Sequence, residues 1–356
     1  MTSYAFQASP EFNRQLDEVL AEIADETAST LGDGLVALIL GGGYGRGEGG
    51  IFLRDGREEP YNDLDLTLVV ADRNLPALRR LRPIEERYAA RLGIHVDFSR
   101  PLTVQDIVHW PHWLMWQDLL NGHVVLHGPQ DILTAHAPAG LLAPLPRVEA
   151  LRLLLNRGAG LLWARRVLLD CEPEPDSGFV DRNYWKASLA LGDAVLIASQ
   201  RHQTAYRGRD VVFRQIADQD AAVRALDLEA LYSRALEFKF SPHRFADEVQ
   251  TTGSLLALAQ RWAQTLLLVE SRRTGQAFVD LAGYTAWRGR REPELSMWRC
   301  LPKNVLRNLR LGRFSARYPR ETLYRRLPGL LCQAEPTGPA WSASTARFLD
   351  IWRRYN

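Results

Sequence analysis

The sequence has few cysteines and no long apolar run. Its 356 residues include only Cys171, Cys300 and Cys332, which are widely separated and form no Cys-x-x-Cys pair. This spacing argues against a disulfide framework and against a cysteine zinc site. No run of about 18 uncharged apolar residues occurs, and the N-terminus lacks a basic segment followed by an apolar one. We therefore expect a soluble, cytoplasmic protein with no transmembrane segment.

Length and charge indicate two domains with different surroundings. A chain of 356 residues exceeds the usual size of one compact domain, and its 46% hydrophobic content is ample for ordinary cores. The net charge of +2 hides an asymmetry, because the first 70 residues are strongly acidic. The stretch from Lys303 to Arg326 is instead basic, with Glu321 as its one acidic residue.

The first 137 residues carry the signals of a mixed α and β domain. Apolar residues from Phe12 to Thr27 recur at helical spacing and predict a helix that ends at Gly32 and Gly34. Strands are expected at residues 35–40, 63–70 and 94–99, with a short edge strand at 122–126. Helices are expected at 76–92 and 104–120, and a loop or small hairpin at 49–61.

The rest of the chain is almost wholly helical in pattern. A proline-rich link at 138–146 precedes apolar residues that recur at three-to-four spacing through residues 147–170, 183–201, 226–238 and 246–273. We predict an α+β protein, with a small mixed-sheet domain at 1–137 followed by an all-helical bundle at 147–356 that contains the basic stretch.

Two features of the first domain carry chemistry. The turn Gly41-Gly42-Gly43-Tyr44-Gly45-Arg46-Gly47 follows a predicted buried strand, and its glycines would let backbone N–H groups approach phosphate oxygens closely. A helix after this turn would add its positive end. Asp63 and Asp65 then leave the same face of the next strand, and Asp97 points away from the apolar face of a third.

The three carboxylates would suit divalent metal. Oxygen-only ligands favour Mg²⁺ or Mn²⁺ over zinc, and in a two-metal site one ion neutralises the departing pyrophosphate while the other lowers the pKa of the attacking hydroxyl. An acid-x-acid pattern is weak evidence alone, because it recurs at sites such as Asp218/Asp220. Context distinguishes Asp63/Asp65, since a glycine turn precedes them and an apolar strand follows.

The run from Gly42 to Glu48, followed by Asn62-Asp63-Leu64-Asp65-Leu66, resembles the signature of the polymerase-beta-like nucleotidyltransferase superfamily. The resemblance covers roughly residues 35 to 100. It implies that Gly42 and Gly43 line the triphosphate, that Asp63 and Asp65 bind metal, and that Asp97 is the third carboxylate and base. Gly43 and Asn62 stand where the family usually has serine, and the gap between turn and aspartates is longer than usual.

The same resemblance extends, less specifically, to the helical half. It looks like the accessory domain of aminoglycoside-type and other small-molecule nucleotidyltransferases. Asn183, Lys186 and Asp193 share one predicted helical stripe, opposite Trp185 and Leu189, and could face the active site. For Lys186 and Asp193, an ordinary solvated face or an internal ion pair is the alternative interpretation. Together with Gly42, Gly43, Tyr44 and Arg46, Lys186 is a candidate nucleotide-binding residue.

The resulting prediction is a Mg²⁺-dependent nucleotidyltransferase. It would transfer the NMP group of an NTP, with ATP expected, to a hydroxyl of a small molecule, an RNA or a protein, and release pyrophosphate.

Other functions stay open at this point. One alternative is a dinucleotide-binding fold, which also has an acidic residue about 20 residues after its glycines, where Asp63 stands. This alternative leaves Asp65 and Glu48 without a role. A nucleotide-sensing or RNA-binding protein could use the stretch from Lys303 to Arg326 as its surface for RNA, another polyanion or an anionic membrane. The alternative for this stretch is an ordinary solvated helix with buried leucines. A toxin that nucleotidylates tRNA would combine both features. The pairs His109/His112 and His123/His127 have zinc-ligand spacing, but nearby tryptophans favour packed histidines.

Overall fold

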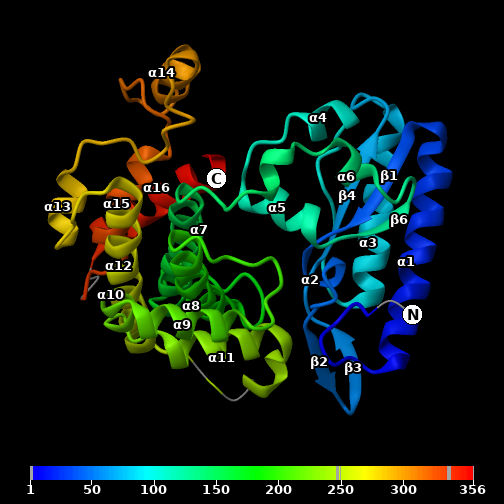
Figure 1. The fold of residues 1–356 in the computed structure, drawn as a ribbon, viewed down its shortest axis with the longest axis horizontal. Helices are drawn as coiled ribbons and strands as arrows, with labels where there is room; N and C mark the ends of the chain where they lie inside the picture. The colour runs from blue at the N-terminus through cyan, green and yellow to red at the C-terminus, as the bar shows by residue number, and fades with distance from the viewer. Residues whose placement is uncertain (1–2, 246–247, 249, 335–337, 356) are drawn as a thin grey trace. The chain divides into compact units, whose positions relative to one another are not determined.

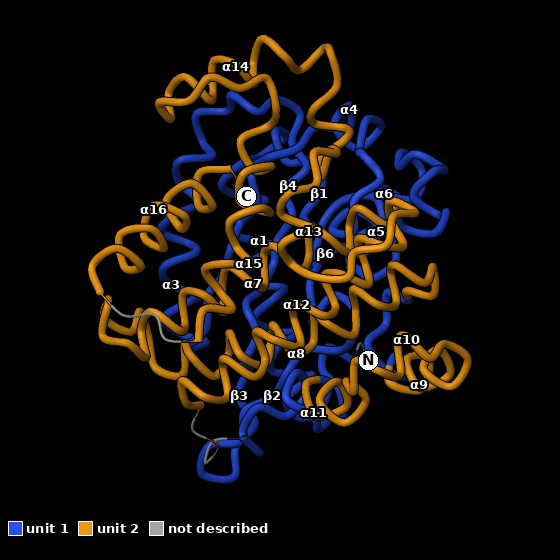
Figure 2. Tube along the Cα trace, turned by 90° about the vertical axis from the view of Figure 1, so that its left-hand side faces the viewer, with its two compact units in different colours: residues 1–145, 203–209, 236–247 blue, residues 146–202, 210–235, 248–356 orange. Residues whose placement is uncertain are grey.

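The computed structural model describes residues 3–245, 248, 250–334 and 338–355. The fold is α+β, as predicted: a small mixed sheet near the N-terminus is followed by many helices (Figure 1). The chain divides into two compact units (Figure 2). Unit 1 contains residues 1–145, 203–209 and 236–247, and unit 2 contains residues 146–202, 210–235 and 248–356. None of the described helices is long and apolar enough to span a bilayer.

Unit 1 is built on a four-stranded sheet of order β5-β4-β1-β6. Strand β1 pairs antiparallel with both β4 and β6, and β4 pairs parallel with β5. The strands are β1 (Leu35–Leu40), β4 (Leu64–Val70), β5 (Val96–Phe98) and β6 (Val124–His127). All four predicted strands are thus confirmed within two or three residues. The polar stretch at 49–61 forms the hairpin β2 (Ile51–Arg54) and β3 (Arg57–Pro60).

Helices cover the sheet of unit 1. Helix α1 (Pro10–Leu31) begins at Ser9, whose side chain accepts the N–H of Phe12, and its apolar face joins a core with β1, β4 and α3. The predicted helix at 76–92 is a 3-10 turn, η2 (Pro76–Arg80), followed by α3 (Arg82–Leu92).

The single helix expected at 104–120 is wrong. Two helices form instead, α4 (Val104–Val108) and α5 (Leu114–Asn121), because Pro111 cannot donate a helical hydrogen bond and disfavours helix in the residue before it. Two further short pieces complete this half, α6 (Ile132–His136) and η3 (Ala139–Leu142).

Unit 2 is helical. Its central helices α7 (Val148–Leu168), α8 (Phe179–Ala198) and α12 (Thr252–Thr274) pack on one another. The remaining elements are α9 (Arg209–Gln219), α10 (Ala221–Arg224), α11 (Glu229–Phe240), α13 (Leu281–Ala286), η5 (Trp298–Cys300), α14 (Leu301–Leu309), α15 (Glu321–Leu331) and α16 (Pro339–Tyr355). The helix predicted from 246 begins at Thr252, where Thr251 and Ser254 form a capping box, and residues 246, 247 and 249 lie outside the described residues.

The predicted split of the chain at 137–147 misses two segments. Residues 203–209 and 236–247, including the last turn of α11 and η4 (Pro242–Phe245), belong to unit 1. Aromatic contacts explain this placement: the Phe240 ring packs 4.6 Å from that of Phe6, and the Phe238 ring lies 6.1 Å from that of Tyr61.

Candidate active site

The carboxylates predicted from the sequence lie at one end of the sheet in unit 1. Strands β4 and β5 are parallel, and their register places Asp65 opposite Asp97. The neighbours Leu64 and Leu66 are fully buried, whereas Asp65 and Asp97 are exposed, so both carboxylates leave the sheet on the face opposite that core. Asp63 directly precedes β4 and is also exposed.

The three carboxylates share one electrostatic field. The pKa of the Asp65 carboxyl is raised above its ordinary value. The largest cause is desolvation by the surrounding protein, followed by the charges of Asp63 and Asp97. Arg46 and Lys239 act in the opposite direction. The protein's own cations therefore do not fully compensate this concentration of negative charge.

The three carboxylates offer oxygen ligands, and these are the ligands that the hard divalent cations Mg²⁺ and Mn²⁺ prefer. Across the described part of the chain, no group of three or more histidine, cysteine, aspartate or glutamate side chains converges as a formed metal site. Among the described residues, neither histidine pair therefore gathers with a third such side chain into a metal site. His109 instead contacts the Gln105 carbonyl oxygen, 2.8 Å from its Nδ1, and burial lowers the pKa of His123.

The glycine turn runs directly against Asp65. The Gly41 N–H donates to the Asp65 carbonyl oxygen at 2.8 Å. Gly42 has a φ of +61°, and a Cβ atom at this position would lie 2.0 Å from Asp65 Oδ2. Only glycine can therefore occupy position 42 without displacing the carboxylate. Gly43 is less constrained, since its Cβ would come no closer than 3.3 Å to any neighbour.

The helix expected after the turn is a single turn, α2 (Gly42–Gly45), so it supplies little of the dipole that a long helix would. The side chain of Tyr44 is fully buried, so its predicted contact with a nucleotide would have to come from its backbone. Its hydroxyl donates to the Gly50 carbonyl oxygen at 2.9 Å and accepts the N–H of Tyr61 at 2.9 Å. Asn62 accepts the Gly50 N–H at 2.6 Å. Tyr44 and Asn62 thereby fix the loop that ends at Asp63.

Glu48 ties the glycine turn to the returning segment 203–209. Its side chain is fully buried, and its carboxylate accepts the backbone N–H groups of Tyr206, at 2.9 and 3.0 Å, and of Arg207, at 3.0 Å. The Arg207 guanidinium adds a fourth, longer contact at 3.4 Å. A buried carboxylate satisfied in this way holds two distant segments together.

Three cations surround the ring of Tyr206. The guanidinium carbon of Arg209 lies 3.8 Å from the ring centroid, Lys239 Nζ 4.6 Å, and the guanidinium carbon of Arg46 5.3 Å. The Arg46 Nε atom is buried without a hydrogen bond and lies 3.9 Å from Glu48 Oε2. Because Arg46 and Lys239 also act on Asp65, positive charge and carboxylates lie in the same part of unit 1.

Sequence reasoning missed Tyr206 and Lys239. Both lie more than 150 residues after the glycine turn, in a part of the chain whose pattern is helical. The one local signal is the run Tyr206-Arg207-Gly208-Arg209, an aromatic and basic loop just before a helix. Loops of that composition are frequent places for binding residues.

The polar stripe of α8 divides between the core and the surface of unit 2. Asp193 is buried and accepts the Tyr232 hydroxyl at 2.6 Å, so it belongs to the core of unit 2. Asn183 donates to the carbonyl oxygen of Phe179 at 2.8 Å. Lys186 is exposed on α8 in unit 2 and stays a prediction as a nucleotide contact.

Comparison with models of known protein families, with curated proteins and with solved structures gives no match to this chain.

Proposed function

We propose that the protein is a metal-dependent nucleotidyltransferase that transfers the NMP group of an NTP, with ATP expected, to a hydroxyl acceptor. The observation that carries this proposal is the pairing of Asp65 with Asp97 on parallel strands, with Asp63 beside them and the Gly42 turn against the Asp65 carboxylate. Acidic residues on neighbouring strands next to a glycine turn combine the two requirements of this reaction, metal ligands and a backbone that a triphosphate can approach.

Asp63, Asp65 and Asp97 would hold Mg²⁺ or Mn²⁺. A bound divalent ion would lower the pKa of the acceptor hydroxyl and offset the charge of the triphosphate. The raised pKa of Asp65 supports this assignment, because a cation would relieve the repulsion that Asp63 and Asp97 impose on it.

The other steps of the proposed reaction are assigned to residues of unit 1. The acceptor oxygen attacks the α-phosphorus and forms a new P–O bond, the bond between the α-phosphorus and the bridging oxygen breaks, and pyrophosphate leaves. Asp97 takes the hydroxyl proton. The backbone at Gly42 and Gly43 approaches the triphosphate, and Lys239 and Arg46, held around Tyr206, supply positive charge to its oxygens.

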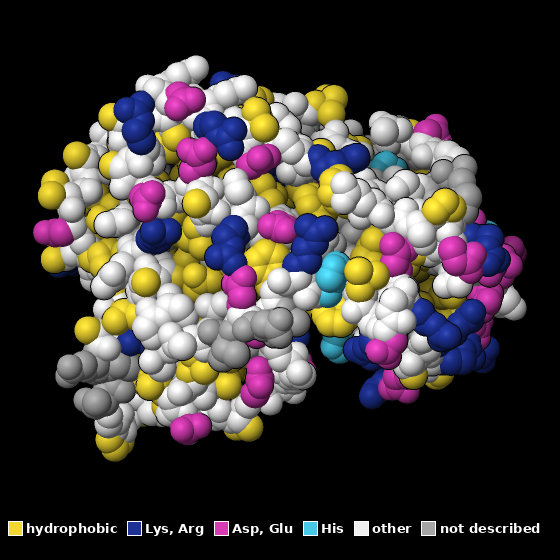
Figure 3. Space-filling view, turned by 90° about the horizontal axis from the view of Figure 1, so that it is seen from below, with side chains coloured by type: hydrophobic (Ala, Val, Ile, Leu, Met, Phe, Trp, Pro, Cys, Tyr) yellow, Lys and Arg dark blue, Asp and Glu magenta, His cyan; other side chains and the backbone are white. Residues whose placement is uncertain are grey.

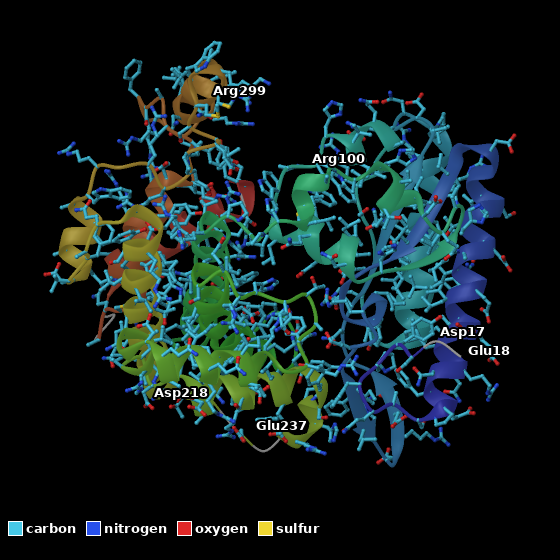
Figure 4. The ribbon with its side chains drawn as sticks, viewed as in Figure 1. Asp17, Glu18, Arg100, Asp218, Glu237 and Arg299 are labelled. Carbon is cyan, nitrogen blue, oxygen red and sulfur yellow. The ribbon has the colours of Figure 1, made fainter. Side chains whose placement is uncertain are left out.

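Labelled NTPs test the proposal. The purified full-length protein is incubated with α-labelled NTPs, Mg²⁺ and fractions of small molecules, RNA and protein from a cell extract, beside Asp63→Asn and Asp65→Asn. Asp218→Asn is the matched control, because Asp218 belongs to the other Asp-x-Asp pattern and is exposed on α9 (Figure 4). We expect wild type and Asp218→Asn to label one of the fractions. Asp63→Asn and Asp65→Asn should each label that fraction at least about 100-fold more slowly. Equal labelling by all four proteins would overturn the assignment.

A further inference from the structure

Helix α14 of unit 2 has its apolar side facing solvent. Asn304 and Asn308 are buried, at 0% and 1% exposure, whereas Leu306 and Leu309 on the opposite side are 52% and 53% exposed. Figure 1 shows α14 projecting from the end of unit 2, and the same projection is seen in Figure 2. A helix normally buries its leucines and exposes its amides, so this arrangement is the reverse of a solvated surface helix.

Polar contacts hold α14 in place. Asn304 donates to the Leu295 carbonyl oxygen at 2.9 Å, and Asn308 donates to the carbonyl oxygens of Ser315 at 3.1 Å and Arg317 at 2.7 Å. The outward leucines therefore contribute little to keeping the helix folded. Trp298, at 79% exposure, and Phe314, at 92%, extend the apolar surface before and after the helix. We call Trp298, Leu306, Leu309 and Phe314 the apolar patch.

Residues 295–320 contain no aspartate or glutamate and seven basic residues. Four of these have partners or stack on a ring: Arg307 lies over Tyr318, Arg313 binds Thr322, Arg317 binds the Gly289 carbonyl oxygen, and Arg320 binds Glu292. Arg299, Lys303 and Arg310 are exposed beside the apolar patch, and Arg299 is labelled at α14 in Figure 4. On the face drawn in Figure 3, by contrast, acidic and basic side chains are interspersed.

We propose that α14 and its flanking residues dock unit 2 onto an anionic lipid bilayer. Exposed leucine, tryptophan and phenylalanine next to lysine and arginine form the pattern of a helix that lies in the headgroup region. Projecting side chains suit a deformable bilayer, whereas a protein partner would need a matching hollow. Two leucines have no role in stacking RNA bases, which favours lipid over RNA. Arg299, Lys303 and Arg310 complement acidic headgroups.

Vesicle sedimentation tests the proposal with the full-length protein. Vesicles of phosphatidylcholine alone are compared with vesicles that also contain phosphatidylglycerol, for wild type, Leu306→Ser/Leu309→Ser and Lys303→Glu/Arg310→Glu. Val279→Ser, which alters an exposed apolar residue elsewhere in unit 2, is the matched control. We expect wild type and Val279→Ser to bind the anionic vesicles, and each double variant to bind them roughly tenfold more weakly or worse. Circular dichroism should show the wild-type fold throughout, since all five substituted positions are exposed.

Several results would overturn the proposal. These are sedimentation with neither vesicle, equal binding to both vesicle types, and anionic binding that survives Leu306→Ser/Leu309→Ser. In a parallel titration with single-stranded RNA, tight salt-dependent binding by a protein that ignores vesicles would assign the surface to nucleic acid instead. None of these readouts depends on nucleotidyl transfer, so the two proposals stand or fall separately.

Discussion

Asp65 on β4 and Asp97 on β5 are register partners on adjacent parallel strands, and the Asp97 carboxylate adds to desolvation and to the charge of Asp63 in raising the pKa of Asp65. Like charges placed side by side cost stability unless another group compensates them. Here Arg46 and Lys239 compensate only in part. Sites that sacrifice stability in this way are frequent where charge is used for binding or catalysis.

Asp65→Asn should stabilise the metal-free protein at neutral pH. The folded-state pKa of Asp65 lies above its unfolded value, so the folded state binds the proton more tightly and this carboxyl lowers stability as pH rises through the folded pKa. The gain should be no more than about 1 kcal/mol, because Asp65 is exposed and solvent screens it. Thermal unfolding as a function of pH measures it. The gain should vanish below the ordinary carboxyl pKa, and a gain that persists there would contradict the account.

Position 42 should tolerate no side chain, whereas position 43 should accept serine. Gly42→Ala combines a positive φ with a clash against Asp65 Oδ2, and we expect it to cost about 1–3 kcal/mol and to abolish transfer. In Gly43→Ser the added Cβ atom would lie 3.3 Å from its nearest neighbours. The free energy of unfolding of this variant should be within about 1 kcal/mol of the wild-type value. Urea unfolding compares the two. If Gly43→Ser lowers the free energy of unfolding more than Gly42→Ala does, the tighter position of the turn is not Gly42.

Glu48→Ala should loosen the segment 203–209. It leaves the buried N–H groups of Tyr206 and Arg207 without their acceptor, at a cost of about 3 kcal/mol. Faster proteolysis within 203–209 should accompany the lower stability. Glu18→Ala is the control, since Glu18 is exposed on α1 and should change stability by less than about 0.5 kcal/mol. Equal effects of the two variants would show that Glu48 has no special role.

Lys239→Met should weaken nucleotide binding. Lys239 Nζ lies over Tyr206, and its charge acts on Asp65, so its loss removes positive charge from the proposed triphosphate site. We expect Kd for the NTP to rise roughly tenfold, or ~1.4 kcal/mol. Equilibrium dialysis with labelled NTP gives this value. Lys303→Met, an exposed lysine on α14, serves as the control and should bind like wild type. An NTP affinity that is unchanged in Lys239→Met would remove Lys239 from the site. Lys186→Met in the same assay decides whether Lys186 also contributes to NTP binding.

Local patterns were sufficient to predict the strands and the carboxylates. The apolar run at 35–40 is bounded by glycines, and alternation at 94–99 separates Asp97 from Val96, so β1 and β5 follow from the sequence. Tyr206 and Lys239 could not be predicted in the same way. They join unit 1 through aromatic packing and the Glu48 carboxylate, and such long-range contacts leave no periodic signal.

Burial sets the side chains of two candidate residues apart from the others. Tyr44 and Asp193 are polar residues in motif-like positions, and both are buried, bonded within their own units. A helical stripe identifies which residues share a face, yet it does not say whether that face meets solvent or the core.

The stoichiometry of phosphate products tests the central claim most directly. Pyrophosphate and transferred label are counted together during a single reaction with α-labelled NTP, Mg²⁺ and the acceptor fraction. The account predicts one pyrophosphate for each nucleotide transferred, and loss of both products in Asp65→Asn but not in Asp218→Asn. Release of orthophosphate in place of pyrophosphate, or unchanged products from Asp65→Asn, would contradict it.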